Sequence, residues 1–160
     1  MMSEALVRHY FDAFARLDGE AMAACYHPSA SFSDPIFPDL RGERVGWRWR
    51  MLTRGATDMH LDYVIVFGDE RKAQVEWQSR YRFAGSGREV RNQGLSTLAF
   101  WDGRIVRQID EFDFWRWSRS SVGLMGTLFG GLGPVRGMVQ RRAAAQLERY
   151  IARSKAPAES

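Results

Sequence analysis

Hydrophobic residues recur every three or four positions over the first fifty residues, which is the spacing of an amphipathic α-helix. The first such stretch aligns Tyr10 and Phe14 on one stripe. A short strand is expected before Pro35, at residues 30–34, because proline has no backbone N–H to donate to a sheet. The pattern predicts three helices, at residues 3–17, 19–26 and 42–54.

From residue 57 onward the spacing changes to strict alternation, which is the pattern of a half-buried β-strand. Trp77 and Tyr81, for example, share one side of a segment whose other side carries Glu76 and Arg80. Four strands separated by glycine-containing turns are predicted at residues 58–67, 72–83, 89–100 and 104–114. Helices followed by a meander of strands predict an α+β fold, in which helices cover the apolar face of one sheet.

Charge is distributed unevenly along the 160 residues, whose formal net charge is +4. Residues 1–114 hold 15 Lys and Arg against 17 Asp and Glu, whereas residues 115–160 hold 8 against 2. A nucleic-acid-binding face needs an excess of basic residues on the folded body, so the nearly neutral first part argues against nucleic acid as a partner. The last part combines a glycine-rich stretch, residues 122–139, with a predicted arginine-rich helix, residues 135–154.

Other sequence features limit the class of protein. The single cysteine, Cys25, excludes an intrachain disulfide and a cysteine-cluster metal site. The histidines lack the spacing of metal ligands and no phosphate-binding glycine motif is present, so we expect neither a metal nor another cofactor. The first residues lack the layout of a secretory signal, and no apolar run reaches the roughly 18 residues of a membrane span. These features predict a cytoplasmic protein.

Three segments, YFDAFARLDGEAM, SFSDPIFPDLRG and LAFWDGRIVRQIDEFD, resemble the nuclear transport factor 2-like superfamily in order and spacing. That superfamily includes ketosteroid isomerase, SnoaL-type polyketide cyclases and limonene-epoxide hydrolase. The resemblance covers residues 3–114. It implies a cone-shaped, curved, mixed β-sheet wrapped around N-terminal helices (a cystatin-like α+β barrel), with a C-terminal helical extension. We therefore expect a SnoaL-like cone domain at residues 1–114, with residues 115–160 packed on the same domain.

The resemblance also implies site residues. Tyr10 matches the oxyanion-binding tyrosine of ketosteroid isomerase, and Asp34, in Ser-Asp-Pro, matches its general base. Asp110 lies where SnoaL-type cyclases have an acid–base aspartate on the final strand. Ser96 stands where the isomerase has a hydrogen-donating aspartate, so each of the two mechanisms is matched only in part.

Proton transfer beside a carbonyl requires a base near the carbon acid and a donor near the developing negative charge. Asp34 and Asp110 are therefore the candidate catalytic bases, and Tyr10 is the candidate donor. Aromatic walls are expected to accept a small, flat, apolar ligand and to raise the pKa of a carboxyl group that they bury. The expected substrate-binding residues are Phe14, Trp47, Met51, Trp77, Tyr81, Asn92, Ser96 and Phe112.

The favoured function is a cofactor-independent isomerase, cyclase or hydrolase that acts on a small apolar cyclic carbonyl compound. The main alternative is a non-catalytic ligand-binding or dimerisation module, in which Asp34 caps a loop, Asp110 pairs with an arginine and Tyr10 belongs to the core. Epoxide hydrolysis is disfavoured, because residues 91–93 (Arg-Asn-Gln) lack the second carboxylate of the limonene-epoxide hydrolase pattern. Relatives commonly dimerise through the outer sheet face, so a homodimer is expected. Membrane association through the basic tail is less favoured.

Overall fold

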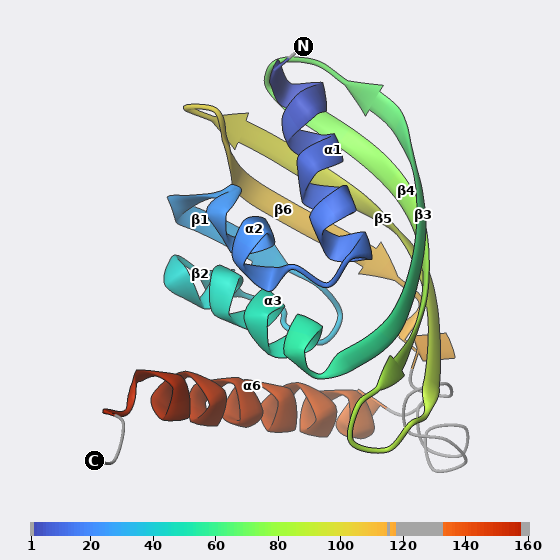
Figure 1. Ribbon diagram of the computed structural model, residues 1–160, viewed down its shortest axis with the longest axis vertical. Helices are drawn as coiled ribbons and strands as arrows, with labels where there is room; N and C mark the ends of the chain where they lie inside the picture. The colour runs from blue at the N-terminus through green and yellow to red at the C-terminus, as the bar shows by residue number, and fades with distance from the viewer. Residues whose placement is uncertain (1, 115, 118–132, 158–160) are drawn as a thin grey trace.

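Six strands form one curved sheet that does not close into a barrel, and three helices lie against its concave face (Figure 1). The computed structural model describes residues 2–114, 116–117 and 133–157. In chain order its elements are α1 (Met2–Ala15), α2 (Gly19–Ala24), β1 (Tyr26–Ser33), β2 (Leu40–Arg41), α3 (Glu43–Arg54), β3 (Ala56–Gly68), β4 (Lys72–Phe83), β5 (Glu89–Trp101), β6 (Arg104–Phe112) and α6 (Gly133–Lys155).

The strand order across the sheet is β2-β1-β6-β5-β4-β3. Strands β3 to β6 form an antiparallel meander, as the alternating pattern predicts. Strand β1 instead pairs in parallel with β6, with Phe32 beside Gln108, and this pairing makes the sheet mixed. The α+β fold with a curved, mixed sheet over N-terminal helices is thus confirmed.

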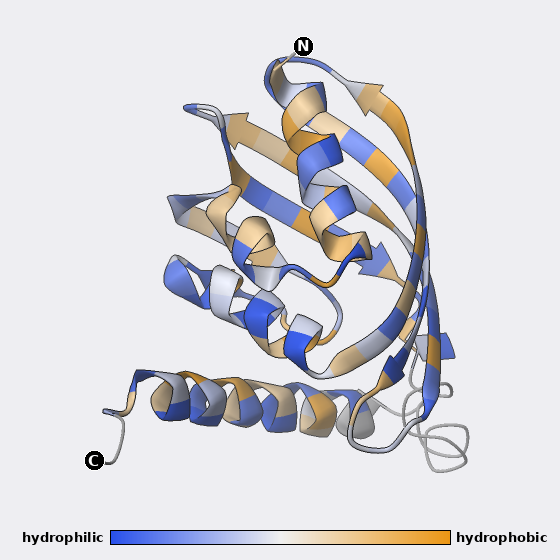
Figure 2. Cartoon of the chain, in the orientation of Figure 1, coloured by the Kyte–Doolittle hydropathy of each residue, from blue (hydrophilic) through white to orange (hydrophobic). Residues whose placement is uncertain are grey.

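The core lies between the concave face of the sheet and the three N-terminal helices. On β4, Val75, Trp77 and Tyr81 are buried, whereas Glu76 and Arg80 are exposed. Figure 2 shows the same alternation of hydrophobic and hydrophilic positions along the strands. Removal of such apolar side chains from water stabilises the fold by roughly 1.5–3 kcal/mol for each large residue, so the alternation decides which face of the sheet meets the helices.

The chain between α2 and β1 differs from the sequence prediction. Asp18 caps α2 by accepting a 3.0 Å hydrogen bond from the Ala21 N–H, but the helix ends at Ala24, two residues earlier than predicted. Strand β1 begins at Tyr26 rather than at residue 30, because Tyr26 already pairs with Ile105 of β6. This long-range pairing is not visible in the local pattern.

Helix α6 packs against α3 and begins two residues before the predicted start. Leu147 is buried, and Glu148 forms an ion pair with Arg44 of α3 at 2.7 Å. Most of the glycine-rich stretch falls on residues 118–132, which lie outside the described residues. None of the helices in the described parts of the chain is long and apolar enough to cross a membrane.

Gly94 on β5 permits a close contact at the centre of the concave face. A Cβ atom at this position would overlap the Glu111 carbonyl oxygen and would lie 2.8 Å from the Trp77 ring. Because the glycine has no Cβ atom, Trp77 and Phe112 approach edge to face across it, with ring centroids 6.4 Å apart. The glycine therefore shapes the wall of the site described next.

Candidate functional site

A cavity of about 340 Å³ lies between α1, α3 and the concave face of the sheet, and residues of α6 complete its lining. Its size is at the lower end of the roughly 300–1,000 Å³ range of small-molecule sites, so it suits a small ligand. Its walls are mainly apolar and aromatic. The lining residues are Phe14, Ile36, Phe37, Arg48, Trp49, Met51, Leu52, Trp77, Ser79, Tyr81, Phe83, Asn92, Asp110, Phe112, Trp117, Val139, Arg142, Ala143 and Gln146.

Asp110 is the buried carboxyl group of this cavity. Its Oδ1 accepts a 2.6 Å hydrogen bond from the Ser96 hydroxyl and a 2.9 Å hydrogen bond from the Gln108 amide. Ser96 is itself held by the Trp77 indole N–H at 3.0 Å. Burial raises the pKa of Asp110 to about 6, although the hydrogen bonds from Ser96 and Gln108 oppose the increase. The carboxyl group therefore changes its protonation state close to neutral pH.

A chain of hydrogen bonds behind Asp110 determines which of its oxygens exchanges a proton. The Tyr26 hydroxyl lies 2.6 Å from Gln108 Oε1, and because a carbonyl oxygen only accepts, Tyr26 is the donor. Tyr10 then donates in the 2.9 Å contact between the two hydroxyl groups, and the Trp49 indole N–H donates to Tyr26 at 2.8 Å. Gln108 thus turns its amide N–H toward Asp110. Since Oδ1 already accepts two hydrogen bonds, the acidic proton is carried by Oδ2, which receives none from the described residues.

Asp34 has a different environment. Its Oδ1 accepts the backbone N–H groups of Ile36 and Phe37 at 2.7 and 2.6 Å, and its Oδ2 pairs with Arg48 Nη2 at 2.9 Å. Its side chain is fully buried, and burial raises its pKa, while Arg48 and the two N–H groups act in the opposite direction. Asp34 does not belong to the cavity lining. It caps the loop and balances the charge of Arg48.

Arg48 is a site residue that the sequence analysis did not identify. Its guanidinium carbon lies 4.0 Å from the centroid of the Trp49 ring and 5.2 Å from that of Phe32. Nη2 is paired with Asp34, but Nη1 is buried without a hydrogen-bond partner. The signal available in the sequence was an arginine on the stripe of Val45 and Trp49.

Six of the residues expected to contact substrate line the cavity, namely Phe14, Met51, Trp77, Tyr81, Asn92 and Phe112. Besides Asp34, three predicted site residues lie outside this lining. Ser96 lies behind Asp110, and Tyr10 is buried behind Gln108, where burial raises its pKa well above the usual value. Trp47 packs against Tyr150 of α6, with ring centroids 6.2 Å apart, and belongs to a separate surface hollow.

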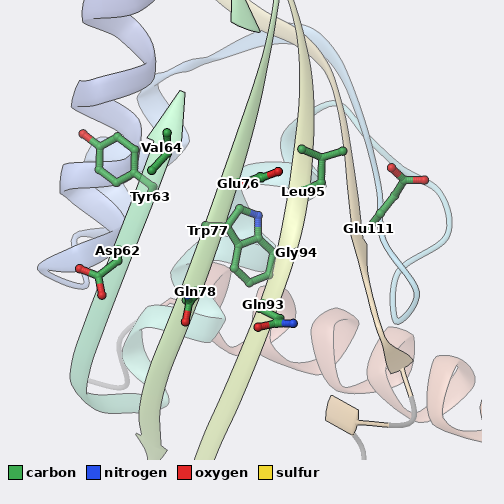
Figure 3. Close-up of a pocket in the computed structure, with 10 residues that line it drawn as sticks. All are labelled: Asp62, Tyr63, Val64, Glu76, Trp77, Gln78, Gln93, Gly94, Leu95 and Glu111. Atoms are coloured by element: carbon green, nitrogen blue, oxygen red, sulfur yellow. The ribbon is translucent and has the colours of Figure 1, made fainter. Parts of the chain in front are cut away.

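A second hollow, of about 500 Å³, lies on the convex face of the sheet (Figure 3). It is formed mainly by outward-facing side chains of the same strands, and its carboxylates on Asp62, Glu76 and Glu111 are exposed to water. Trp77 belongs to the lining of both hollows. No hydrogen-bond network comparable to that of Asp110 links the side chains drawn there. In the described parts of the chain, no three His, Cys, Asp or Glu side chains gather as a metal site. The inner cavity is therefore the better candidate for chemistry.

Comparison with known proteins gives a family match and a fold match. Residues 7–108 match the family model of the SnoaL-like domain. No curated protein sequence matches the chain.

Solved structures with the same fold include three from different bacteria. A protein from Xanthomonas campestris pv. campestris, proposed to be a polyketide cyclase, superposes with a TM-score of 0.65 at 20% identity over 74% of this chain and 96% of that one. A protein from Bacillus subtilis, proposed to be an isomerase, superposes with a TM-score of 0.64 at 15% identity. The match covers 76% of this chain and 94% of that one. An LEH-like epoxide hydrolase from M. tuberculosis superposes with a TM-score of 0.58 at 17% identity. The match covers 79% of this chain and 95% of that one.

Proposed function

Because the chain belongs to the SnoaL-like domain family, we propose that it is a cofactor-independent acid–base enzyme that acts on a small apolar cyclic carbonyl compound. The reaction class is isomerisation, cyclisation or hydrolysis. The observation that carries the proposal is Asp110, a buried carboxyl group that lines an apolar cavity and has a pKa of about 6. A general base works best when its pKa lies close to the pH at which the enzyme operates.

In the proposed reaction, Asp110 takes a proton from the carbon beside the substrate carbonyl through Oδ2. Oδ1 stays bound to Ser96 and Gln108 throughout, so the carboxyl group keeps its orientation. Removal of the proton places negative charge on the carbonyl oxygen, and the Arg48 guanidinium, which also lines the cavity, stabilises this charge. Asp110 then returns the proton at another position, or to the product of ring closure.

The other two residues expected to be catalytic have supporting roles in this proposal. Asp34 holds the Arg48 guanidinium in place through the 2.9 Å ion pair. Tyr10 supports Tyr26 and Gln108, and so fixes the amide that donates to Asp110. Both act through another residue, and neither needs to touch the substrate.

Product analysis on a panel of cyclic ketones tests this function. Asp110→Asn keeps the shape of the side chain but removes the base, so turnover is expected to fall by about 10²-fold or more. Glu111→Gln is the matched control, because Glu111 is adjacent in sequence but faces the exposed side of the sheet. Asp34→Asn is expected to give an intermediate loss. Turnover that survives both aspartate substitutions would contradict the proposal.

A non-catalytic ligand-binding module is the second candidate. The observation that favours it is the Ser96 hydroxyl, which donates to Asp110 and so has no proton left for a substrate. In that case ligands would bind with unchanged affinity to the wild type and to Asp110→Asn, and no ketone of the panel would be converted.

We further propose that the chain forms a homodimer through the convex face of the sheet. Val64 and Val66 expose 65% and 54% of their surface there, which is unusual for apolar side chains on one strand. Light scattering on the wild type and on Val64→Glu tests the assembly, since a charged side chain in the interface is expected to favour the monomer.

A further inference from the structure

The part of the chain beyond the matched family segment contributes to the cavity. The SnoaL-like match ends at residue 108, whereas Val139, Arg142, Ala143 and Gln146 of α6 belong to the cavity lining. Figure 1 shows α6 running beneath α3, across the end of the molecule that holds the turn between β4 and β5. Helix α6 is anchored there by Leu147, which is buried, and by the 3.0 Å hydrogen bond from Gln140 to the Pro35 carbonyl.

The positive charges of the lining are compensated to different degrees. Arg48 is paired with Asp34. Arg142 is exposed and has no ion pair with any described residue, and among the arginines of α6 it is the one that lines the cavity. Arg142 is therefore the uncompensated cation of the cavity in the part of the chain that the structure describes.

Asp110 and Arg142 belong to different walls of the cavity, one on strand β6 and the other on helix α6. In the sheet, Asp110 of β6 pairs with Ser96 of β5, and Ser96 pairs in turn with Val75 of β4. Tyr81 is six residues further along β4, toward the turn near α6. Strand residues advance by about 3.3 Å each, so the lining extends along β4 from the neighbourhood of Asp110 toward α6, and its mainly apolar walls suit an apolar ligand body.

We propose that the cavity binds a ligand that carries a carboxylate on an apolar cyclic body, with Arg142 as the charge partner of that carboxylate. Gln146, one helical turn further along the same face of α6, adds a neutral amide donor. A guanidinium group matches a carboxylate in geometry and donates two parallel hydrogen bonds to it. The inference rests on the proposed function, because it assumes that the same cavity is the active site, and it narrows the substrate class.

Binding of two probes of nearly equal shape tests the inference. 2-Naphthoate carries a carboxylate, and 2-naphthamide replaces it by a neutral amide. Their affinities for the full chain are measured by titration calorimetry or by tryptophan fluorescence, since Trp49 and Trp77 line the cavity. The wild type is expected to bind the naphthoate about five- to tenfold more tightly than the naphthamide.

The variants separate a specific ion pair from general electrostatics. Arg142→Gln is expected to abolish the preference for the naphthoate without a change in naphthamide affinity, and Arg142→Lys to keep part of it. Arg141→Gln is the matched control, because Arg141 neighbours Arg142 on α6 but is absent from the cavity lining. Equal affinities of the two probes for the wild type, or an equal loss in Arg141→Gln and Arg142→Gln, would overturn the inference.

Because these are binding measurements, their result is independent of turnover. If neutral ketones were converted but the protein bound the naphthoate and the naphthamide equally, the inference about the ligand would fail and the proposed function would stand. If the preference for the naphthoate depended on Arg142 but no ketone of the panel were converted, the inference about the ligand would stand and the proposed function would not.

Discussion

Ser96 on β5 donates a 2.6 Å hydrogen bond to Asp110, the residue directly opposite it on β6. The resemblance to ketosteroid isomerase implies a hydrogen-donating acid at the position of Ser96. Here the hydroxyl proton is used within the protein, and the neighbouring strand supplies the carboxyl group. The pair therefore forms one hydrogen-bonded unit, in which Ser96 orients the carboxyl group that acts as the base in the proposed function.

The stability of the protein is expected to depend on pH through Asp110. Its pKa is higher in the folded chain, at about 6, than the ordinary 3.8, so the folded state binds the proton more tightly. Stability contributed by this group is therefore present below pH 3.8 and is lost as the pH rises to about 6. The loss is roughly 3 kcal/mol at full ionisation. Asp110→Asn is expected to remove it, so the variant unfolds at higher urea concentration than the wild type at pH 7, and at a similar concentration at pH 4.

If the wild type and Asp110→Asn had the same urea midpoint at pH 7 as well as at pH 4, the carboxyl group would have an ordinary environment. Glu111→Gln provides the comparison, because it also removes one negative charge but from an exposed position.

Ser96→Ala is expected to raise the pKa of Asp110 above that of the wild type, because it removes a hydrogen bond that favours the ionised form. In the proposed reaction kcat/KM increases with pH through the pKa of the base. The midpoint of this increase, measured between pH 5 and 9, is expected to move upward. Ser86→Ala, in the exposed turn between β4 and β5, is the control, and a midpoint that stays fixed in both variants would exclude the coupling of Ser96 to Asp110.

Removal of one partner of the ion pair between Arg48 and Asp34 is expected to be costly. Arg48→Met leaves a carboxylate whose side chain is fully buried without its counter-charge, which typically lowers the free energy of unfolding by about 3–5 kcal/mol. The double variant Asp34→Asn/Arg48→Met is expected to recover part of that loss. A double-mutant cycle by urea denaturation measures the coupling, and additive effects of the two substitutions would contradict the role assigned to the pair.

Gly94→Ala is expected to destabilise the fold by roughly 1–3 kcal/mol, because the added Cβ overlaps the Glu111 carbonyl oxygen and the Trp77 ring. It is also expected to weaken ligand binding, since Trp77 and Phe112 form the cavity wall. Gly85→Ala is the matched control, with no atom within 4 Å of the new Cβ. Thermal unfolding of the two variants compares them directly, and equal melting temperatures would argue against the close contact.

The sequence predicted the sheet well because one physical pattern, alternation on strands with one buried face, decides both the strands and their orientation. Alternation placed Trp77 and Tyr81 on one side of their strand and Glu76 and Arg80 on the other. In the structure the first two are buried and the other two are exposed. The start of β1 at Tyr26 was missed, because it depends on pairing with a strand about eighty residues away.

The site was predictable only in part for a similar reason. Asp34 and Asp110 look alike as isolated acids in the sequence, and they differ only in what surrounds them. One is balanced by Arg48, and the other is buried with neutral donors. Trp47 and Arg48 are adjacent on α3, so about 100° of helical rotation directs one toward Tyr150 and the other toward the cavity. Local spacing does not decide which of them faces inward.

The most direct test of Asp110 as the proton-exchanging group is a pH titration of its carboxyl carbon by ¹³C NMR, assigned by comparison with Asp110→Asn. A midpoint near pH 6 is expected in the ligand-free protein. A midpoint near 4, as for a carboxyl group in water, would show that Asp110 is solvated and would contradict its role as the proton-exchanging group of an apolar cavity.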